Sequence, residues 1–249
     1  MSQNKLRVLT YNIHKGFNVA NRHFVLQQIR EGLRKTDADI LFLQEMQGKH
    51  LQHEQKIAGW PSAPQFEYLA EMVWPHYVYG KNAVYEAGHH GNAILSKHPF
   101  EHSENINVSP YAWASRSMLH AVIQLSSGQS VHIVCVHFGF LGKERRVQVA
   151  KLCARLESHV PIDAPLLIAG DFNDWLAQDR HLFHEHLNLQ EIFLKTHGHY
   201  AKTFPAWLPI LAVDRIYFRG LVPQSCERLN QSPWHKLSDH APLVATFSL

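Results

Sequence analysis

Short apolar runs recur along the chain and predict more strands than helices. Residues 6–13 alternate between apolar and polar side chains, as expected for a strand with one buried face, whereas residues 39–45 and 165–169 are almost continuously apolar and indicate fully buried strands. Further strands are predicted at residues 76–84, 92–96, 116–125, 130–138, 214–218 and 243–247. A Gly-His-His-Gly turn is expected at residues 88–91, and Ser-Ser-Gly-Gln at residues 126–129 closes a hairpin.

Helical spacing of apolar residues is found in three segments. The first runs from Asn21, which can cap a helix, to about Lys35 and places Val25, Ile29 and Leu33 on one stripe. The second covers residues 66–73 and ends at Trp74-Pro75. The third covers residues 143–159, and its expected inward side chains are Val147, Ala150, Leu152 and Leu156. Residues 48–64 are rich in Gln, His and Gly and predict a loop.

The order of these segments predicts an α/β fold with two packed sheets. Some strands are joined by hairpins and others by helices, so the sheets should be mixed, and there are too many strands for one open sheet. Two sheets packed face to face, with helices outside, bury the apolar faces of all these elements. No repeat, linker or low-complexity tract interrupts the pattern, so residues 1–249 are expected to form a single domain.

The composition is that of a globular protein. Hydrophobic residues make up 45% of the chain and charged residues 18%, which argues against disorder. The net charge of +3 is too small to predict a nucleic-acid partner by itself, but it is compatible with an anionic substrate. Most of the 20 histidines are expected to be surface or packing residues, since no His-x-x-x-His pair stands beside a third zinc ligand.

The cysteines and the N-terminus bear on the compartment. Cys135, Cys153 and Cys226 lie far apart, which argues against a disulfide framework and favours a reducing compartment. Residues 1–5 lead directly into the first strand without a basic and then apolar signal segment, and no apolar run is long enough to span a bilayer. The sequence therefore predicts a cytoplasmic location and shows no sign of a protein partner, and it leaves room for a substrate at a membrane surface.

Four apolar runs end in, or lead out of, small polar groups. These groups are Thr10-Tyr11-Asn12, Leu43-Gln44-Glu45, Ala169-Gly170-Asp171-Phe172-Asn173 and Ser238-Asp239-His240. Gathered at one edge of a sheet, their acids, amides and imidazole would make an oxygen-rich pocket for a hard cation such as Mg²⁺. Such a pocket predicts a metal-dependent reaction on a phosphate ester.

The second and third of these groups carry the more specific signals. A carboxylate at the mouth of a buried strand needs a counter-charge, and Glu45 can obtain it from a divalent cation or from a Lys or Arg. Asp171 and Asn173 alternate along the chain, so both side chains can point to one side. Asp171 can hold or polarise the attacking water and Asn173 can donate to a phosphate oxygen, although an ordinary Asp/Asn turn is the alternative.

Ser238-Asp239-His240 precedes the last predicted strand. Asp239 can bind the cation, and His240 can hydrogen-bond a phosphoryl oxygen or take a proton from water. Asp214, at the start of a strand, is the candidate carboxylate partner of His240, with an ion pair to the adjacent Arg215 as the alternative.

The remaining candidates are single polar residues. Asn12 can orient Asp171 or contact phosphate, and His137 can donate to the scissile phosphate or the leaving group, although a lone histidine at a strand end is more often structural. Weaker candidates for binding phosphate are Asn92, Arg116 and Lys97.

In their order along the chain, these motifs resemble those of the endonuclease/exonuclease/phosphatase superfamily, which has the DNase I-like fold. The motifs are Thr10-Tyr11-Asn12-Ile13, Gln44-Glu45, Gly91-Asn92-Ala93-Ile94-Leu95-Ser96, Val136-His137, Gly170-Asp171-Phe172-Asn173, Asp214-Arg215-Ile216 and Ser238-Asp239-His240-Ala241-Pro242. Each is weak alone, but the ordered set spans nearly the whole chain and is highly specific. The chain is most similar to the small bacterial members of the superfamily.

The resemblance implies a four-layer α/β sandwich with the site at one end of two packed sheets. It implies that Glu45 is the principal ligand of Mg²⁺ or Mn²⁺, with Asp239 and Asn12 close to the cation. It also implies that Asp214 and His240 form a hydrogen-bonded pair.

The resemblance further assigns Asp171 and Asn173 to the attacking water and the phosphate. His137 matches a position at which some relatives use histidine and others tyrosine. DNase I itself places a glutamate behind its equivalent histidine, whereas in this chain the nearby strand begins His89-His90-Gly91-Asn92 and has no acid in register.

The predicted reaction is in-line attack of water on a phosphodiester or phosphomonoester, with His240 and Asp171 both candidates for the general base. Three functions fit: a nuclease or other phosphodiesterase, a phosphatase or phosphodiesterase acting on a lipid headgroup or a small molecule, and a catalytically silent binding module. The modest charge and the apolar segment 205–211 favour the second, and the complete ligand set argues against the third. The basic cluster Lys143, Arg145 and Arg146 is expected to be a solvated helix face.

Overall fold

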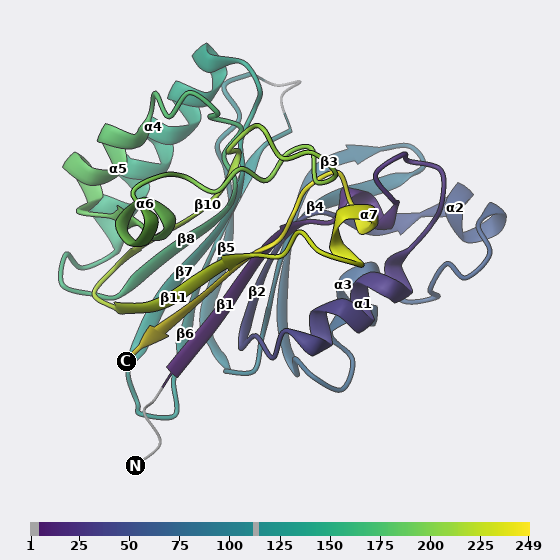
Figure 1. Cartoon of the computed structure of the whole chain (residues 1–249), viewed down its shortest axis with the longest axis horizontal. Coiled ribbons are helices and arrows are strands. Elements are labelled where there is room, and N and C mark those ends of the chain that lie inside the picture. Colours follow the sequence, from purple (N-terminus) through teal and green to yellow (C-terminus); the bar gives the residue numbers. More distant parts are fainter. Residues whose placement is uncertain (1–4, 112–114) are drawn as a thin grey trace.

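The computed structural model describes residues 5–111 and 115–249, and its strands form two six-stranded sheets packed face to face (Figure 1). Residues 1–4, which were expected to lead into the first strand, lie outside the described residues. The strands of the first sheet are β1 (Lys5–Asn12), β2 (Ile40–His50), β3 (His76–Tyr85), β4 (Gly88–Ser96), β11 (Val222–Arg228) and β12 (Leu243–Ser248). Those of the second are β5 (Phe100–Asn107), β6 (Ser117–Gln124), β7 (Ser130–His137), β8 (Leu166–Asp171), β9 (Gln190–Glu191) and β10 (Asp214–Arg219).

Both sheets are mixed, as predicted. Their strand orders are β11-β12-β1-β2-β4-β3 and β5-β6-β7-β8-β10-β9. The central pairs β1–β2 and β7–β8 are parallel, and the other neighbours are antiparallel. The carboxyl ends of the parallel pairs therefore lie at sheet edges that can share one site.

Helices cover the outer faces of the two sheets (Figure 1). Those beside the first sheet are α1 (Leu26–Lys35), α3 (Gln65–Ala70) and α7 (Trp234–Leu237), with the 3-10 helix η1 (His14–Gly16) and the short α2 (Leu51–Lys56) at its margin. Those beside the second are α4 (Gly142–His159) and α5 (Arg180–Leu187), while α6 (Ile192–His197) packs against β10 and β11. No helix in the described residues is both long and apolar enough to cross a membrane.

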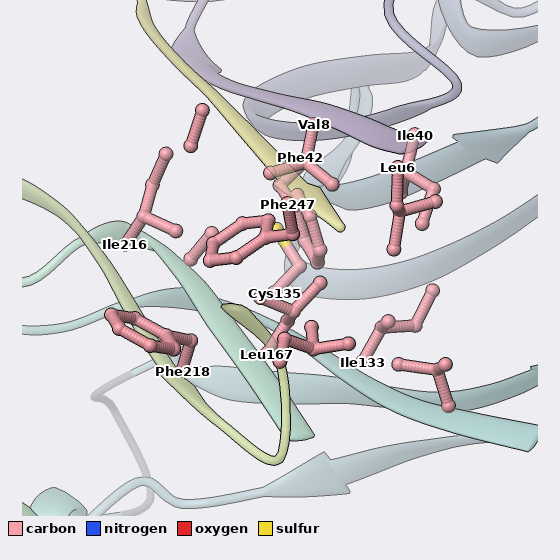
Figure 2. Packing of buried hydrophobic residues seen from close by; sticks show 14 of the residues in the cluster. Leu6, Val8, Ile40, Phe42, Ile133, Cys135, Leu167, Ile216, Phe218 and Phe247 are labelled. Carbon is pink, nitrogen blue, oxygen red and sulfur yellow. The ribbon is translucent and has the colours of Figure 1, made fainter. Parts of the chain in front are cut away.

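The alternation along β1 shows why two sheets are required. Leu6 and Val8 point into the central core, in the same cluster of buried residues as Ile133 and Leu167 of the facing sheet (Figure 2). Leu9 and Tyr11 point the other way, into the layer beneath α1 and α7. Each face of the strand thus has its own apolar partner, and the predicted four-layer α/β sandwich is confirmed.

Several local predictions were wrong. The first helix begins at Leu26, because Asn21 has a left-handed φ of 53° and caps nothing. Residues 88–91 lie inside β4, and the segment expected to be a loop contains the end of β2 and α2. Strands β5, β9 and β11 and helices α5, α6 and α7 were not predicted, since their exposed or very short sequences have little apolar periodicity.

The inward face of α4 was also misassigned. Val147 and Ala150 are exposed, and the buried face instead contains Arg145, Gln148 and Val149 together with the correctly predicted Leu152 and Leu156. The error arose because two polar side chains take inward positions, where they bond to loops near the site. Cys135 and Cys153 are buried free thiols, and Cys226 is a partly buried one.

Candidate active site

The register of the strands gathers the predicted polar groups at one end of the sandwich. His137 at the end of β7 lies opposite Asp171 at the end of β8, and Asp214 at the start of β10 lies on the other side of Asp171. Asn12 ends β1 in the facing sheet, and residues 238–240 lead into β12, which starts beside the end of β1. This end is the upper one in Figure 1, away from the C-terminus.

Glu45 reaches the site through an irregularity in β2. The register between β2 and β4 shifts between Leu43 and Met46, and Glu45 between them has a left-handed φ of 55°. A bulge of this kind re-aims a side chain, and positive φ at a residue other than glycine costs on the order of 1–3 kcal/mol. The strand thus adopts a strained conformation at the residue expected to be the main metal ligand.

Asn12 joins the two sheets at the site. Its amide nitrogen Nδ2 donates to Glu45 Oε1 and to Asp171 Oδ2, each at 3.3 Å. The other oxygen of Asp171 accepts from the backbone N–H of Asn173 at 3.0 Å. Two carboxylates 126 positions apart in the chain therefore share one donor, which brings them to the same point.

Asp214 and His240 form the expected pair. His240 Nδ1 lies 2.8 Å from Asp214 Oδ2, and its Nε2 lies 3.8 Å from Asp171 Oδ2. Ser238 fixes this loop, because its hydroxyl donates to the Asn12 carbonyl at 2.7 Å and accepts from the His240 backbone N–H at 3.2 Å. Together the five residues Asn12, Glu45, Asp171, Asp214 and His240 are called the site cluster below.

The acid–base states of the buried members are set by burial and by one another. Burial raises the pKa of Asp171 to about 7, and repulsion from Asp214 adds to this effect. Burial disfavours the charged form of His240, but Asp214 and Asp171 outweigh it and raise the pKa of His240 to about 10. Near neutral pH, His240 therefore carries a proton while Asp171 is close to its titration point.

Glu45 and His137 differ in charge state. Burial lowers the pKa of His137 to about 3, so this imidazole is neutral near pH 7. Burial opposes ionisation of Glu45, yet neighbouring positive charges and the Asn12 amide lower its pKa to about 2. Since His137 is neutral, the positive charges that act on Glu45 near pH 7 are those of Lys15, whose Nζ lies 3.8 Å from Glu45 Oε2, and of the protonated His240.

Asp239 and Asn173 differ in exposure. Asp239 is partly exposed at the mouth of the site, and its Oδ1 lies 3.7 Å from His14 Nδ1. Asn173 is buried with a left-handed φ of 51°, and its amide nitrogen donates to the Phe138 carbonyl at 2.9 Å. That nitrogen therefore holds the loop after β7, while the backbone of Asn173 supports Asp171.

The fold places the three weaker candidates for phosphate binding in different parts of the molecule. Arg116 lies near enough to His137 for its charge to depress the imidazole pKa, which places it beside the site. Asn92 is fully buried and donates to the Ser117 carbonyl at 3.2 Å, bridging the two sheets. Lys97 is at the opposite end of the sandwich, paired with Asp37 and Asp39 at 2.7 and 3.2 Å.

Two residues near the site were missed from the sequence. Lys15 contacts Glu45 and His14 contacts Asp239, and both follow the end of β1 directly. Their closeness to Asn12 in the chain was a usable signal. The bulge at Glu45 left no comparable signal, because nothing in Leu43-Gln44-Glu45-Met46 marks a break in the strand.

The cluster contains more acid than base. Asp171, Asp214 and His240 offer ligand atoms within 4.8 Å of one another, a spacing that could hold a metal ion. However, His240 Nδ1 is already bonded to Asp214, and a hard cation such as Mg²⁺ prefers oxygen ligands to an imidazole nitrogen. The oxygen groups Glu45, Asp239 and Asn12 are therefore the better candidate ligands for a hard cation.

Comparison with known proteins connects this geometry to a family. Residues 9–240 match the model of the Endonuclease/Exonuclease/phosphatase family. The chain is 42% identical over 248 residues to the protein YbhP of Escherichia coli K12, an alignment that covers 99% of this chain and 98% of YbhP.

Solved structures share the fold. An endonuclease/exonuclease/phosphatase from Beutenbergia cavernae has a TM-score of 0.81 at 19% identity, covering 98% of this chain and 72% of that one. The human Nocturnin catalytic domain with bound sulfate has a TM-score of 0.76 at 20% identity, covering 98% and 94%. Danio rerio TDP2 complexed with a single-stranded DNA product has a TM-score of 0.69 at 18% identity, covering 99% and 100%.

Proposed function

The chain belongs to the endonuclease/exonuclease/phosphatase family, and from that premise we propose that it is a divalent-metal-dependent phosphoesterase that hydrolyses a phosphodiester or phosphomonoester by in-line attack of water. The activities in the family name all cleave phosphate esters. The observation that carries the proposal is the site cluster, in which Asn12 holds Glu45 and Asp171 together beside the Asp214–His240 pair.

The donor set fits Mg²⁺ or Mn²⁺. Asp214 Oδ1 is buried with no hydrogen-bond partner among the described residues, and Glu45 remains ionised in a partly buried position. An excess of buried carboxylate oxygen is costly unless a cation compensates it. Glu45, Asp239 and Asn12 would hold the ion, which when bound would neutralise phosphoryl charge and stabilise the leaving oxygen.

His240 and Asp171 divide the proton chemistry between them. His240 is held by Asp214 and already protonated, so it suits donation of a hydrogen bond to a phosphoryl oxygen better than removal of a proton. Asp171, with a pKa near 7, suits the role of orienting the attacking water and accepting its proton. The acid–base states of the two residues therefore favour Asp171 as the general base.

The other residues act as donors and supports. His137 Nε2 lies 3.5 Å from Asp171 Oδ2, so the neutral imidazole can donate to a phosphoryl or leaving oxygen beside the base. Arg116, at the same edge, supplies a positive charge for the substrate. Asn173 supports Asp171 through its backbone and fixes the following loop through its side chain.

The test is hydrolysis of soluble esters by the purified protein. Bis-p-nitrophenyl phosphate and p-nitrophenyl phosphate, with Mg²⁺ or Mn²⁺ and with EDTA, report diester and monoester cleavage and metal dependence. We expect Asp171→Asn to lower kcat/KM on the order of a thousandfold, because the base is lost while the shape is kept. Asp163→Asn, at an exposed acid beyond the far end of α4, is the matched control and should stay within about twofold of wild type.

Each alternative to the proposed function predicts a different experimental result. Metal binding in a calorimeter without turnover of any ester, including plasmid DNA, single-stranded RNA, phosphoinositides and lysophospholipids, would identify a silent binding module. A rate unchanged by EDTA, or equal in Asp171→Asn and wild type, would contradict the proposed chemistry.

A further inference from the structure

Three segments that leave the site each expose an aromatic residue followed by leucine. The pairs are Phe140-Leu141 after β7, Trp175-Leu176 after β8, and Trp207-Leu208 before β10. Their exposures are 62% and 64%, 44% and 67%, and 63% and 55%. Large apolar side chains exposed in adjacent loops mark an interaction surface. These six residues are called the apolar rim.

The third segment is tied to the site itself. The backbone N–H of Ala206 donates to the Asp239 carbonyl at 2.7 Å, and the Phe204 ring lies 5.1 Å from the ring of His240. Figure 1 shows this segment, in green between α6 and β10, crossing the upper end of the sheets. The Trp207-Leu208 pair is therefore displayed next to the reacting groups.

Buried ion pairs hold the three segments together. Arg145 donates to the carbonyls of Phe140 and Asn173 at 3.3 and 3.0 Å and pairs with Asp174 and Asp179 at 3.2 and 2.9 Å. Arg215 pairs with Asp174 at 3.5 Å and donates to the Ala212 carbonyl at 3.5 Å, which adds the segment before β10. Arg145, Asp174, Asp179 and Arg215 are each at most 5% exposed and are called the arginine clamp.

In the segments that carry the rim, the acidic side chains are buried and the basic side chains are exposed. The acids of the first two segments and the start of α4, namely Glu144, Asp174 and Asp179, are buried, and residues 204–213 contain no acid. Lys143, Arg146 and Arg180 from the same stretches are exposed. Asp239, which bonds to the third segment, is a partly exposed acid at this surface. The exposed charges of the first two segments and the start of α4 are cationic, and with the apolar rim they complement an anionic interface with an apolar interior.

We propose that the apolar rim docks the site onto an anionic lipid bilayer, so that the ester hydrolysed is a phospholipid headgroup ester at the membrane surface. The inference rests on the proposed phosphoesterase function and names its substrate class. Tryptophan favours the headgroup level and leucine the acyl region, so an aromatic-leucine pair in each loop matches the layers of a membrane surface. A nucleic acid would use aromatic rings for stacking but has no use for three exposed leucines.

The test separates docking from catalysis. Vesicles of phosphatidylcholine with phosphatidylglycerol are floated with the protein, and bis-p-nitrophenyl phosphate measures turnover without a membrane. We expect Trp207→Ser with Leu208→Ser to reduce vesicle binding by at least about tenfold, because two buried apolar contacts are lost. Turnover of the soluble ester should remain within about twofold, since neither side chain belongs to the site cluster.

The matched control is Ile162→Ser with Val222→Ser, two equally exposed apolar residues at the opposite end of the sandwich, and it should float like wild type. Wild-type protein that does not float, rim and control variants that float equally, or rim-dependent binding of a single-stranded oligonucleotide instead of vesicles would each overturn the inference. Flotation without hydrolysis of any ester would refute the phosphoesterase function and leave docking intact. Hydrolysis of the soluble ester without flotation would refute docking and leave the phosphoesterase function intact.

Discussion

Two buried groups of charged side chains lie side by side in this molecule and are balanced in opposite ways. In the arginine clamp, two carboxylates face two guanidinium groups, and every charge is paired within the chain. In the site cluster, three carboxylates face one protonated imidazole, with Lys15 at the margin. The charges of the clamp are balanced, whereas the carboxylates of the site cluster outnumber the cationic side chains beside them.

We expect this difference in charge balance to separate a structural group from a functional one. Burial alone does not, because members of both groups are almost fully buried. The sign of imbalance is the pKa of Asp171, which burial raises to about 7 with added repulsion from Asp214. Unpartnered polar atoms do not separate the groups, since Asp214 Oδ1 and Arg215 Nε both lack a hydrogen-bond partner within the described residues. A protein retains such an arrangement where a ligand completes it.

The largest expected effect comes from neutralising an acid of the site cluster. Asp214→Asn removes the counter-charge of His240, and we expect kcat/KM for the soluble ester to fall on the order of a thousandfold or more. The free energy of unfolding in urea should stay within about 1 kcal/mol of wild type or rise, since one of several crowded acids is gone. Loss of stability without a comparable loss of turnover would place Asp214 with the clamp.

The same substitution in the clamp should have the opposite outcome. Asp174→Asn leaves Arg145 and Arg215 buried with an unbalanced charge, and we expect unfolding free energy to fall by about 3–5 kcal/mol. At a temperature where the variant is folded, kcat/KM for the soluble ester should remain within about tenfold of wild type. A variant that is as stable as wild type but inactive would show that Asp174 is a functional residue. The distinction between the arginine clamp and the site cluster would then be wrong.

The sequence predicted the site cluster better than the clamp. Asn12, Asp171 and Asp214 stand at strand ends and His240 stands shortly before β12, so their alignment follows from strand direction and can be anticipated. Glu45 is the exception, because it lies inside β2. The layered fold was predicted for the same reason, since apolar runs with helices between them require two covered sheets. What the sequence could not supply was the bulge that turns Glu45 inward, because a strand break depends on its neighbours in the sheet.

The helical pattern of the sequence did not predict the arginine clamp. Arg145 stands beside Lys143 and Arg146, and this basic run was expected to be solvated, but Arg145 is 5% exposed. Its partners Asp174 and Asp179 lie 29 and 34 residues further along the chain, so local pattern carries no trace of the pairing. Ion pairs between residues far apart in the chain can be identified only once the positions of the loops in the fold are known.

The smallest expected effect concerns the stability contributed by Glu191. This buried acid is neutralised by a proton and not by an ion pair to any residue that the structure describes. Glu191 is 5% exposed at the start of α6, and although its Oε2 accepts from the Leu194 N–H at 2.7 Å, burial raises its pKa from 4.5 to about 7. The folded protein thus holds a proton on Glu191 where the unfolded chain has lost it. Stability from this residue is therefore complete below about pH 4.5 and decreases as pH rises to about 7.

Glu191→Gln should remove that slope. The difference in unfolding free energy between wild type and variant, measured in urea from pH 5 to 8, should change by about 1–3 kcal/mol, with wild type losing stability relative to the variant as pH rises. Mg²⁺ should leave the difference unchanged, because a proton and not a metal balances this acid. A slope that Mg²⁺ abolishes would link Glu191 to the site, whereas a slope indifferent to Mg²⁺ would show that Glu191 is independent of the proposed metal site.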